Sequence, residues 1–77
     1  MSKNRTLLGA TWCGPCKRVK GFLDDKDLVE GVDYHYLDID SEEGLELARD
    51  WAIRSVPSMS IDGKIYTGDT KIMEMLN

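Results

Sequence analysis

Residues 10–17 of this 77-residue chain read ATWCGPCK, and they contain both of its cysteines, Cys13 and Cys16. A cysteine pair with two residues between its members can be a structural disulfide, part of a metal site or a redox-active dithiol. The elements on either side of the pair, together with the other ligands that the chain offers, distinguish these three uses.

The residues around the cysteine pair indicate a strand followed by a helix. The short apolar run 7–10 comes directly before the motif and is typical of a buried strand. After it, apolar side chains recur at three- and four-residue spacing, which predicts an amphipathic helix that fades near residues 24–26. These side chains are Cys16, Val19, Phe22 and Leu23.

A second strand and a second helix are predicted before Pro57. Residues 32–39 are rich in aromatic and β-branched side chains, which favour strands. Asp40 is the expected N-cap of the following helix, with Glu43 at the position that a capping box requires. Pro57 cannot lie inside a helix, so this helix must end before it. Its expected apolar face is Leu45, Ala48 and Ala52, widened by Leu47 and Trp51.

The last part of the chain predicts a β-hairpin and a third helix. Asp62-Gly63 lies between two short apolar runs, 59–61 and 64–66, and signals a hairpin because a type I′ turn needs positive φ. Asp69 or Thr70 is the expected cap of the final helix. The apolar face of that helix is Ile72, Met73 and Leu76.

The predicted element order is therefore β-α-β-α-β-β-α. Two strands joined through a helix form a parallel pair with a right-handed crossover, and the hairpin adds antiparallel strands. We expect an α/β fold in which one mixed four-stranded sheet is flanked by three helices. A chain of 77 residues has room for one domain, which we expect to span residues 1–77.

The composition argues against several classes of function. The net charge of -4 does not favour binding to nucleic acid or to an anionic membrane surface. No apolar run approaches the roughly 18 residues of a membrane span, and the first residues lack the apolar stretch of a signal peptide. We therefore expect a cytoplasmic, monomeric protein.

Two of the three uses of the cysteine pair are disfavoured. A permanent disulfide is uncommon in a reducing compartment, and one that spans two residues would constrain the unfolded chain very little. A structural zinc site needs four ligands, and the chain offers one histidine, His35, in a predicted strand. His35 is interpreted as an ordinary strand residue, and we expect no metal and no bound cofactor.

A redox-active pair fits the position of the motif. Cys13 is predicted at the start of a helix, where unpaired N–H groups and the helix dipole favour its thiolate. Cys16 follows within the first turn, on the same side, and can attack a mixed disulfide formed at Cys13. Pro15 suits the first turn. Gly14 leaves the backbone open to a partner, and Trp12 is interpreted as a contact surface for that partner.

Residues 12–16, WCGPC, resemble the active site of the thioredoxins. Ser55-Val56-Pro57 resembles the segment in which thioredoxin-fold proteins carry a cis proline opposite the active cysteines. The resemblance implies a thioredoxin fold, with Cys13 as the nucleophile and Cys16 as the resolving cysteine. It also implies that Pro57 is cis, and that Ser55, Val56 and Pro57 contact an extended substrate segment, as in β-augmentation.

A second resemblance, to the glutaredoxins, concerns the chain length and residues 66–70, YTGDT. Glutaredoxins carry a Gly-Gly pair here that helps to bind glutathione, which makes Gly68 and Asp69 candidate substrate-binding residues. The departures from that pattern are Thr67 for the first glycine, Lys71 for an acidic residue and Ala10 for a basic one. The run instead resembles glutaredoxin-like redoxins that serve some ribonucleotide reductases and take electrons from thioredoxin reductase.

Leu7 is the main departure from the thioredoxin pattern. Thioredoxins keep a buried carboxylate at this position, which is thought to assist proton transfer at the second cysteine. Solvent or Asp38 would have to replace it, and Asp38 itself is interpreted as a surface carboxylate of the strand.

The sequence thus predicts a thiol–disulfide oxidoreductase that reduces protein disulfides, with ribonucleotide reductase as a candidate client and a thioredoxin-reductase-type enzyme as electron source. The Gly-Pro pair between the cysteines resembles reducing members of the superfamily, so we expect a potential nearer about -270 mV than about -120 mV. A glutathione-dependent glutaredoxin and a non-catalytic binding subunit are the alternatives.

Overall fold

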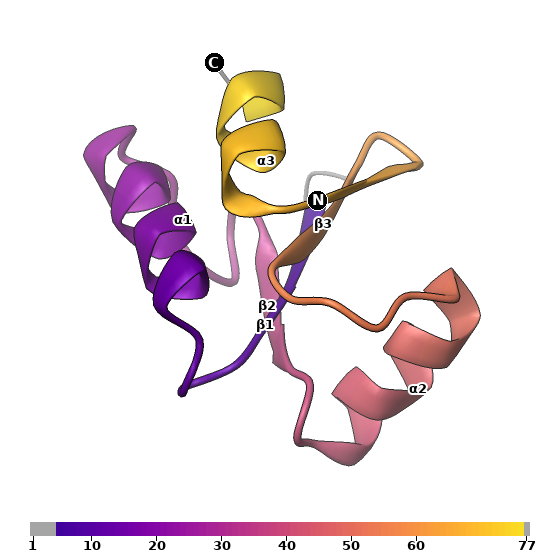
Figure 1. Cartoon of the computed structure of the whole chain (residues 1–77). Coiled ribbons are helices and arrows are strands. Elements are labelled where there is room, and N and C mark those ends of the chain that lie inside the picture. The colour runs from indigo at the N-terminus through magenta and orange to yellow at the C-terminus, as the bar shows by residue number, and fades with distance from the viewer. Residues whose placement is uncertain (1–4, 77) are drawn as a thin grey trace.

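The computed structural model describes residues 5–76, and these contain the predicted elements in the predicted order (Figure 1). The strands are β1 (Arg5–Gly9), β2 (His35–Asp38), β3 (Ser58–Ile61) and β4 (Lys64–Thr67). The helices are α1 (Gly14–Asp25), α2 (Glu42–Trp51) and α3 (Asp69–Leu76). The predicted fold class is confirmed.

The four strands form one mixed sheet in the order β2-β1-β3-β4. β1 pairs in parallel with β2 and antiparallel with β3, so it lies inside the sheet, with Leu7 opposite Tyr36 on one side and Met59 on the other. Figure 1 shows α1 and α3 against one face of the sheet and α2 against the opposite face. Both faces are therefore covered, as an α/β sandwich requires.

The main core lies between the sheet and the pair formed by α1 and α3. Its buried side chains are Leu7, Val19, Leu23, Tyr34, Met59, Ile61 and Ile72. A second, smaller cluster consists of Ala10, Cys13 and Cys16, with Ile39 and Val56 packed against it. The cysteine pair is therefore part of the packed interior, just beyond the C-terminal end of β1.

The second strand is shorter than predicted, because β2 begins at His35 rather than at Val32. A turn precedes it, in which the Asp33 carboxylate accepts a hydrogen bond from the Val29 N–H at 2.8 Å. Gly31 adopts a φ of 87° in the same turn, and Val32 is 62% exposed. A local side-chain hydrogen bond competes here with strand pairing.

The sequence predicted Asp40 as the N-cap of α2, but in the structure the N-cap is Ser41. The Ser41 Oγ accepts a hydrogen bond from the Gly44 N–H at 3.0 Å and donates one to the Asp38 carbonyl at 2.6 Å. This one-residue shift moves the third helical position from Glu43 to Gly44. The predicted capping box therefore does not form.

The buried face of α2 also differs from the prediction. Gly44 and Ala48 are buried, whereas Leu45 is 47% exposed. Ala52 is exposed and ends the helix with a left-handed φ of 56°. Because Gly44 has no side chain, the first turn of α2 comes close to the backbone at the end of β2, and this contact determines which face is buried.

Replacement of Ser41 by alanine is expected to lower the free energy of unfolding by about 1 kcal/mol, because it removes the side-chain acceptor in the first turn of α2. Asp40→Ala is the matched control. Asp40 is exposed and lies outside the helix, and among the described residues its carboxylate accepts a hydrogen bond only from the exposed Trp12 indole. A surface hydrogen bond of this kind contributes little, so we expect the replacement to change stability by less than about 0.5 kcal/mol. Urea denaturation measures both, and a larger loss for Asp40→Ala would contradict the cap observed here.

The hairpin follows the prediction. Asp62 and Gly63 have positive φ values of 51° and 87°, as a type I′ turn requires. In α3, Ile72 is buried and both Met73 and Leu76 are half-buried, so the predicted apolar face is confirmed.

The start of α3 differs slightly from the prediction, because Asp69 is the first helical residue rather than the cap. The Gly68 carbonyl accepts the hydrogen bond of the Ile72 N–H at 3.1 Å. The Asp69 carboxylate lies in the first turn, where the helix dipole favours negative charge. It is 3.2 Å from the Arg18 guanidinium of α1, so Asp69 links α3 to α1.

Candidate active site

Cys13 caps the N-terminus of α1. Its backbone is extended, with φ -95° and ψ 112°, and its Sγ accepts a hydrogen bond from the Cys16 N–H at 3.2 Å. Gly14 and Pro15 are the first two residues of the helix. Proline is tolerated there because the N–H groups of the first turn have no hydrogen-bond partner within the helix. The helix dipole and the Cys16 N–H both favour negative charge on the Cys13 sulfur once the pair is reduced.

Cys13 and Cys16 form a disulfide in this structure, with their Cα atoms 5.2 Å apart. The two residues are not equivalent. Cys16 is 1% exposed, whereas Cys13 is 6% exposed and lies between the exposed residues Trp12 and Gly14. A partner that approaches from solvent therefore reaches Cys13 first.

The segment that ends in Pro57 lies against the cysteine pair. The Val56–Pro57 peptide bond is cis, and the Val56 carbonyl oxygen is 3.6 Å from the Cys13 Sγ. Val56 also packs against the small cysteine cluster. The fold thus brings together two motifs that are 43 positions apart in the sequence.

Ser58 anchors this proline segment and was not singled out in the sequence. It is fully buried, and its hydroxyl donates a hydrogen bond to the Ser55 carbonyl at 2.8 Å and lies 3.1 Å from the Thr67 Oγ1. The Gly68 N–H donates to the Pro57 carbonyl at 2.9 Å. These contacts connect the segment to β4 and to the start of α3. A serine after a proline carries no sequence pattern that would reveal this role.

Trp12 lies on the surface beside the cysteines. It is 68% exposed, and its indole N–H donates a hydrogen bond to the Asp40 carboxylate at 2.9 Å. Asp40 comes just before α2, so Trp12 extends from the start of α1 towards the start of α2. It forms one edge of the surface around Cys13.

The remaining candidate residues lie at different depths. Gly14, Pro15 and Ser55 are exposed, and Gly68 and Asp69 are half-buried. A Cβ atom on Gly14 would meet no atom within 4 Å, so the backbone there faces open space.

Leu7 stands where thioredoxins keep a carboxylate that is thought to assist proton transfer at the second cysteine, and Asp38 is the side chain that would have to replace that carboxylate. Leu7 is fully buried in the main core and contributes no polar atom. Asp38 is half-buried at the end of β2, and its carboxylate accepts a hydrogen bond from the Asp40 N–H at 2.8 Å. One Asp38 oxygen is therefore engaged in the turn before α2, and solvent or Asp38 as the group that deprotonates Cys16 stays a prediction.

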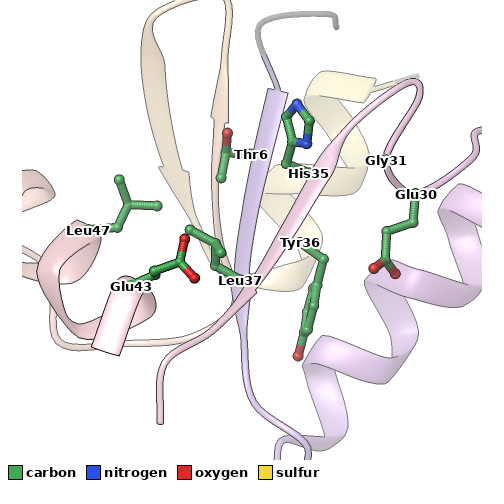
Figure 2. Close-up of a pocket in the computed structure, with 8 residues that line it drawn as sticks. All are labelled: Thr6, Glu30, Gly31, His35, Tyr36, Leu37, Glu43 and Leu47. Atoms are coloured by element: carbon green, nitrogen blue, oxygen red, sulfur yellow. The ribbon is translucent and has the colours of Figure 1, made fainter. Parts of the chain in front are cut away.

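A pocket of about 430 Å³ lies along the outer edge of β2 (Figure 2). Its lining comes from β1, β2, α2 and the turn before β2, and it includes neither cysteine. The lining residues are Thr6, Glu30, Gly31, His35, Tyr36, Leu37, Glu43 and Leu47. The pocket is therefore separate from the disulfide.

Two further observations concern the part of the chain that the structure describes. Within residues 5–76, no group of three or more His, Cys, Asp and Glu side chains is placed to hold a metal ion. None of the helices in the same range combines the length and the apolar character needed to cross a membrane.

A disulfide at the start of the first helix of this fold is typical of thioredoxin-like thiol–disulfide oxidoreductases. Comparison with known proteins identifies the family, because the family model for thioredoxin matches residues 6–74. The chain therefore belongs to the thioredoxin family, and Cys13 and Cys16 are its Cys-x-x-Cys pair.

Named relatives support this placement. The thioredoxin of Bacillus subtilis is 33% identical over 58 residues, which cover 73% of this chain and 56% of that protein. Thioredoxin H1 of Arabidopsis thaliana is 37% identical over 60 residues, which cover 73% of this chain and 50% of that protein. The chain thus spans about half the length of the curated relatives that it matches.

Solved structures of two kinds resemble this one. The thioredoxin-like protein BC3987 has a TM-score of 0.73 and 25% identity, with 95% of this chain and 99% of that chain covered. A glutaredoxin from Archaeoglobus fulgidus has a TM-score of 0.71 and 25% identity, with 97% and 87% covered. The protein is therefore a small redoxin of the thioredoxin family with glutaredoxin-like structural neighbours.

Proposed function

We propose that this protein is a protein disulfide reductase that carries electrons by cycling Cys13 and Cys16 between dithiol and disulfide. The observation that carries the proposal is the position of the Cys13 sulfur, which caps α1 and accepts the Cys16 N–H at 3.2 Å. A thiolate at a helix N-terminus is stabilised and can attack a disulfide near neutral pH.

The reaction has two exchange steps. The Cys13 thiolate attacks one sulfur of the client disulfide, a bond forms between Cys13 and that sulfur, and the other client sulfur leaves as a thiolate. Cys16 then loses its proton and attacks the Cys13 sulfur, and the mixed disulfide breaks. The second client thiolate leaves and takes up a proton from solvent, so that two electrons have passed to the client.

The surface around Cys13 supports a role in holding the client. Trp12, Gly14 and Pro15 form its exposed part beside the disulfide. Val56 has its carbonyl oxygen next to the Cys13 sulfur. An extended client segment would lie along the cis-proline segment, with backbone bonds to Val56, as in β-augmentation. The other residues proposed for this contact are Ser55, Pro57, Gly68 and Asp69.

The proposed electron source is a thioredoxin-reductase-type enzyme, and a ribonucleotide reductase is the proposed client. The choice of a reductase over glutathione is supported by three departures from the glutaredoxin pattern at the glutathione site, which are Thr67, Lys71 and Ala10. We also propose that the protein is cytoplasmic and monomeric, with a single domain that spans the chain. Its redox group is the Cys13–Cys16 disulfide, without a bound cofactor.

A glutathione-dependent activity is the second candidate. It is favoured by a structural likeness to a buckwheat glutaredoxin solved with glutathione, which has a TM-score of 0.69 and 27% identity. A non-catalytic binding subunit is the third, and the intact cysteine pair argues against it.

The test offers the oxidised protein two electron sources in parallel, NADPH with thioredoxin reductase and reduced glutathione, and follows the reduction of insulin disulfides. We expect turnover with the reductase to be at least about tenfold faster than with glutathione. Faster turnover with glutathione would favour the second candidate, and no turnover with either source would contradict the proposed reductase activity.

A further inference from the structure

Cys16 poses a problem for the second exchange step. It must lose a proton before it can attack, yet it is 1% exposed. Burial disfavours a charged thiolate unless a neighbouring group stabilises it. Leu7, fully buried in the main core, contributes no polar atom to do so.

The hydroxyl of Tyr36 lies near Cys16, across Gly9. A Cβ atom built on Gly9 would be 3.3 Å from the Cys16 Sγ and 3.3 Å from the Tyr36 Oη. It would also be 3.1 Å from the Tyr36 Cε1. The Cys16 sulfur and the Tyr36 hydroxyl oxygen therefore lie no further from each other than twice this 3.3 Å distance. One bridging water can span such a separation. Gly9 has no side chain that would crowd these two atoms.

Tyr36 is held in this position from the α1 side. The Lys20 ammonium of α1 lies 4.2 Å from the ring centroid, and the same ammonium is 3.4 Å from the Glu30 carboxylate. The ring also packs against the main core. In Figure 2, Tyr36 extends from β2 towards α1, on the opposite side of the strand from Leu37.

The hydroxyl of Tyr36 is a hydrogen-bond donor at neutral pH. Burial raises its pKa above 10.0, and the carboxylates of Asp38 on β2 and Glu30 in the preceding turn raise it further. Lys20 is the charged group that faces the ring from α1. Tyr36 therefore keeps its proton and can donate it to a negatively charged acceptor.

We infer that Tyr36 is a positioning residue of the second exchange step, whose hydroxyl donates a hydrogen bond to the Cys16 thiolate, directly or through one water. The inference rests on the proposed function, because it assigns Cys16 the resolving role. The proton of Cys16 passes to solvent. The hydroxyl stays protonated throughout and lowers the free energy of the thiolate, since a hydrogen bond to the charged form favours that form.

The test measures the pH at which Cys16 ionises in the full chain with Cys13→Ser, from the NMR chemical shift of the Cys16 β-carbon. Adding Tyr36→Phe removes the hydroxyl and leaves the ring in place. We expect Tyr36→Phe to raise the midpoint of the Cys16 titration by about one pH unit. At a given pH below the midpoint, this means about tenfold less Cys16 thiolate than without the substitution.

Tyr34→Phe is the matched control. Tyr34 is buried in the main core, and its pKa is raised by that burial and then by Glu30 and Asp24. Asp24 lies at the far end of α1 from Cys16. We expect no change in the ionisation of Cys16. If Tyr36→Phe leaves the midpoint where it was, or if Tyr34→Phe raises it equally, the inference is wrong.

Gly9→Ala is a second variant, which keeps the hydroxyl but places a methyl group 3.3 Å from both the hydroxyl and the sulfur, where it crowds them. We expect it to raise the midpoint as Tyr36→Phe does, and the two changes together to raise it no further, because both interrupt one interaction. Additive shifts would overturn the inference. The titration needs no redox partner, so its outcome is distinct from a failure of the reductase assay.

Discussion

Cys16→Ser is expected to accumulate as a covalent mixed disulfide with its client, whereas Cys13→Ser is expected to form none. Both variants should lose turnover by about a thousandfold or more, on the order of the effect of removing an enzyme's nucleophile. The reason is the different position of the two sulfurs. Cys13 caps α1 and is the more exposed, while Cys16 lies behind it. Without Cys16, nothing within the site resolves the bond that Cys13 has formed.

Mass spectrometry without reductant measures this difference, after each reduced variant is mixed with oxidised insulin. The chain with both cysteines replaced is the control and should trap nothing. Trapping by Cys13→Ser, with none by Cys16→Ser, would reverse the assigned roles. A double variant that kept the biological function would instead support the binding-subunit alternative.

Gly44→Ala is expected to lower the free energy of unfolding by about 3 kcal/mol, the upper part of the usual range for overpacking. A Cβ atom on Gly44 would overlap the Asp38 carbonyl oxygen and lie 2.6 Å from its carbonyl carbon. These are backbone atoms at the end of β2, so relief requires α2 to move away from the sheet. A chain of this length has only about 4 to 12 kcal/mol of stability in total.

Gly21→Ala is the matched control, since Gly21 also lies within a helix. A Cβ atom there would meet nothing within 4 Å, so alanine should stabilise the protein by about 0.5 to 1 kcal/mol. Urea denaturation of the two variants compares them directly. Equal effects of the same sign would show that helix propensity, rather than close approach to the sheet, governs both positions.

Local sequence patterns predicted most of this fold. The apolar run before Cys13, the helical spacing after it and the Asp62-Gly63 turn each depend on near neighbours, and each predicted the right element. The first strand begins earlier than the run 7–10, at Arg5, and ends at Gly9. The cysteine pair was identified in the same way, because its spacing and its position before a helix are local features. Family membership followed from residues 12–16 and was then confirmed by the match over residues 6–74.

The errors arose where a hydrogen bond or a backbone contact a few residues away outweighed the preference of a single residue. Asp40 and Ser41 are both good N-caps, and the Asp38 carbonyl decided between them by accepting the Ser41 hydroxyl. Leu45 fits a helical apolar face, yet the close approach of Gly44 to the end of β2 turned Leu45 outwards.

The sequence by itself determined the order of the elements, the fold class and the two cysteines, because these depend on periodicity and on residues a few positions apart. The tertiary structure alone decided that Val56 lies against Cys13, that Ser58 connects the proline segment to Thr67 of β4 and that the Tyr36 hydroxyl and the Cys16 sulfur both lie beside Gly9. Each of these contacts joins different elements. Their distances are determined by how the strands pair and how the helices pack, and no local pattern encodes that.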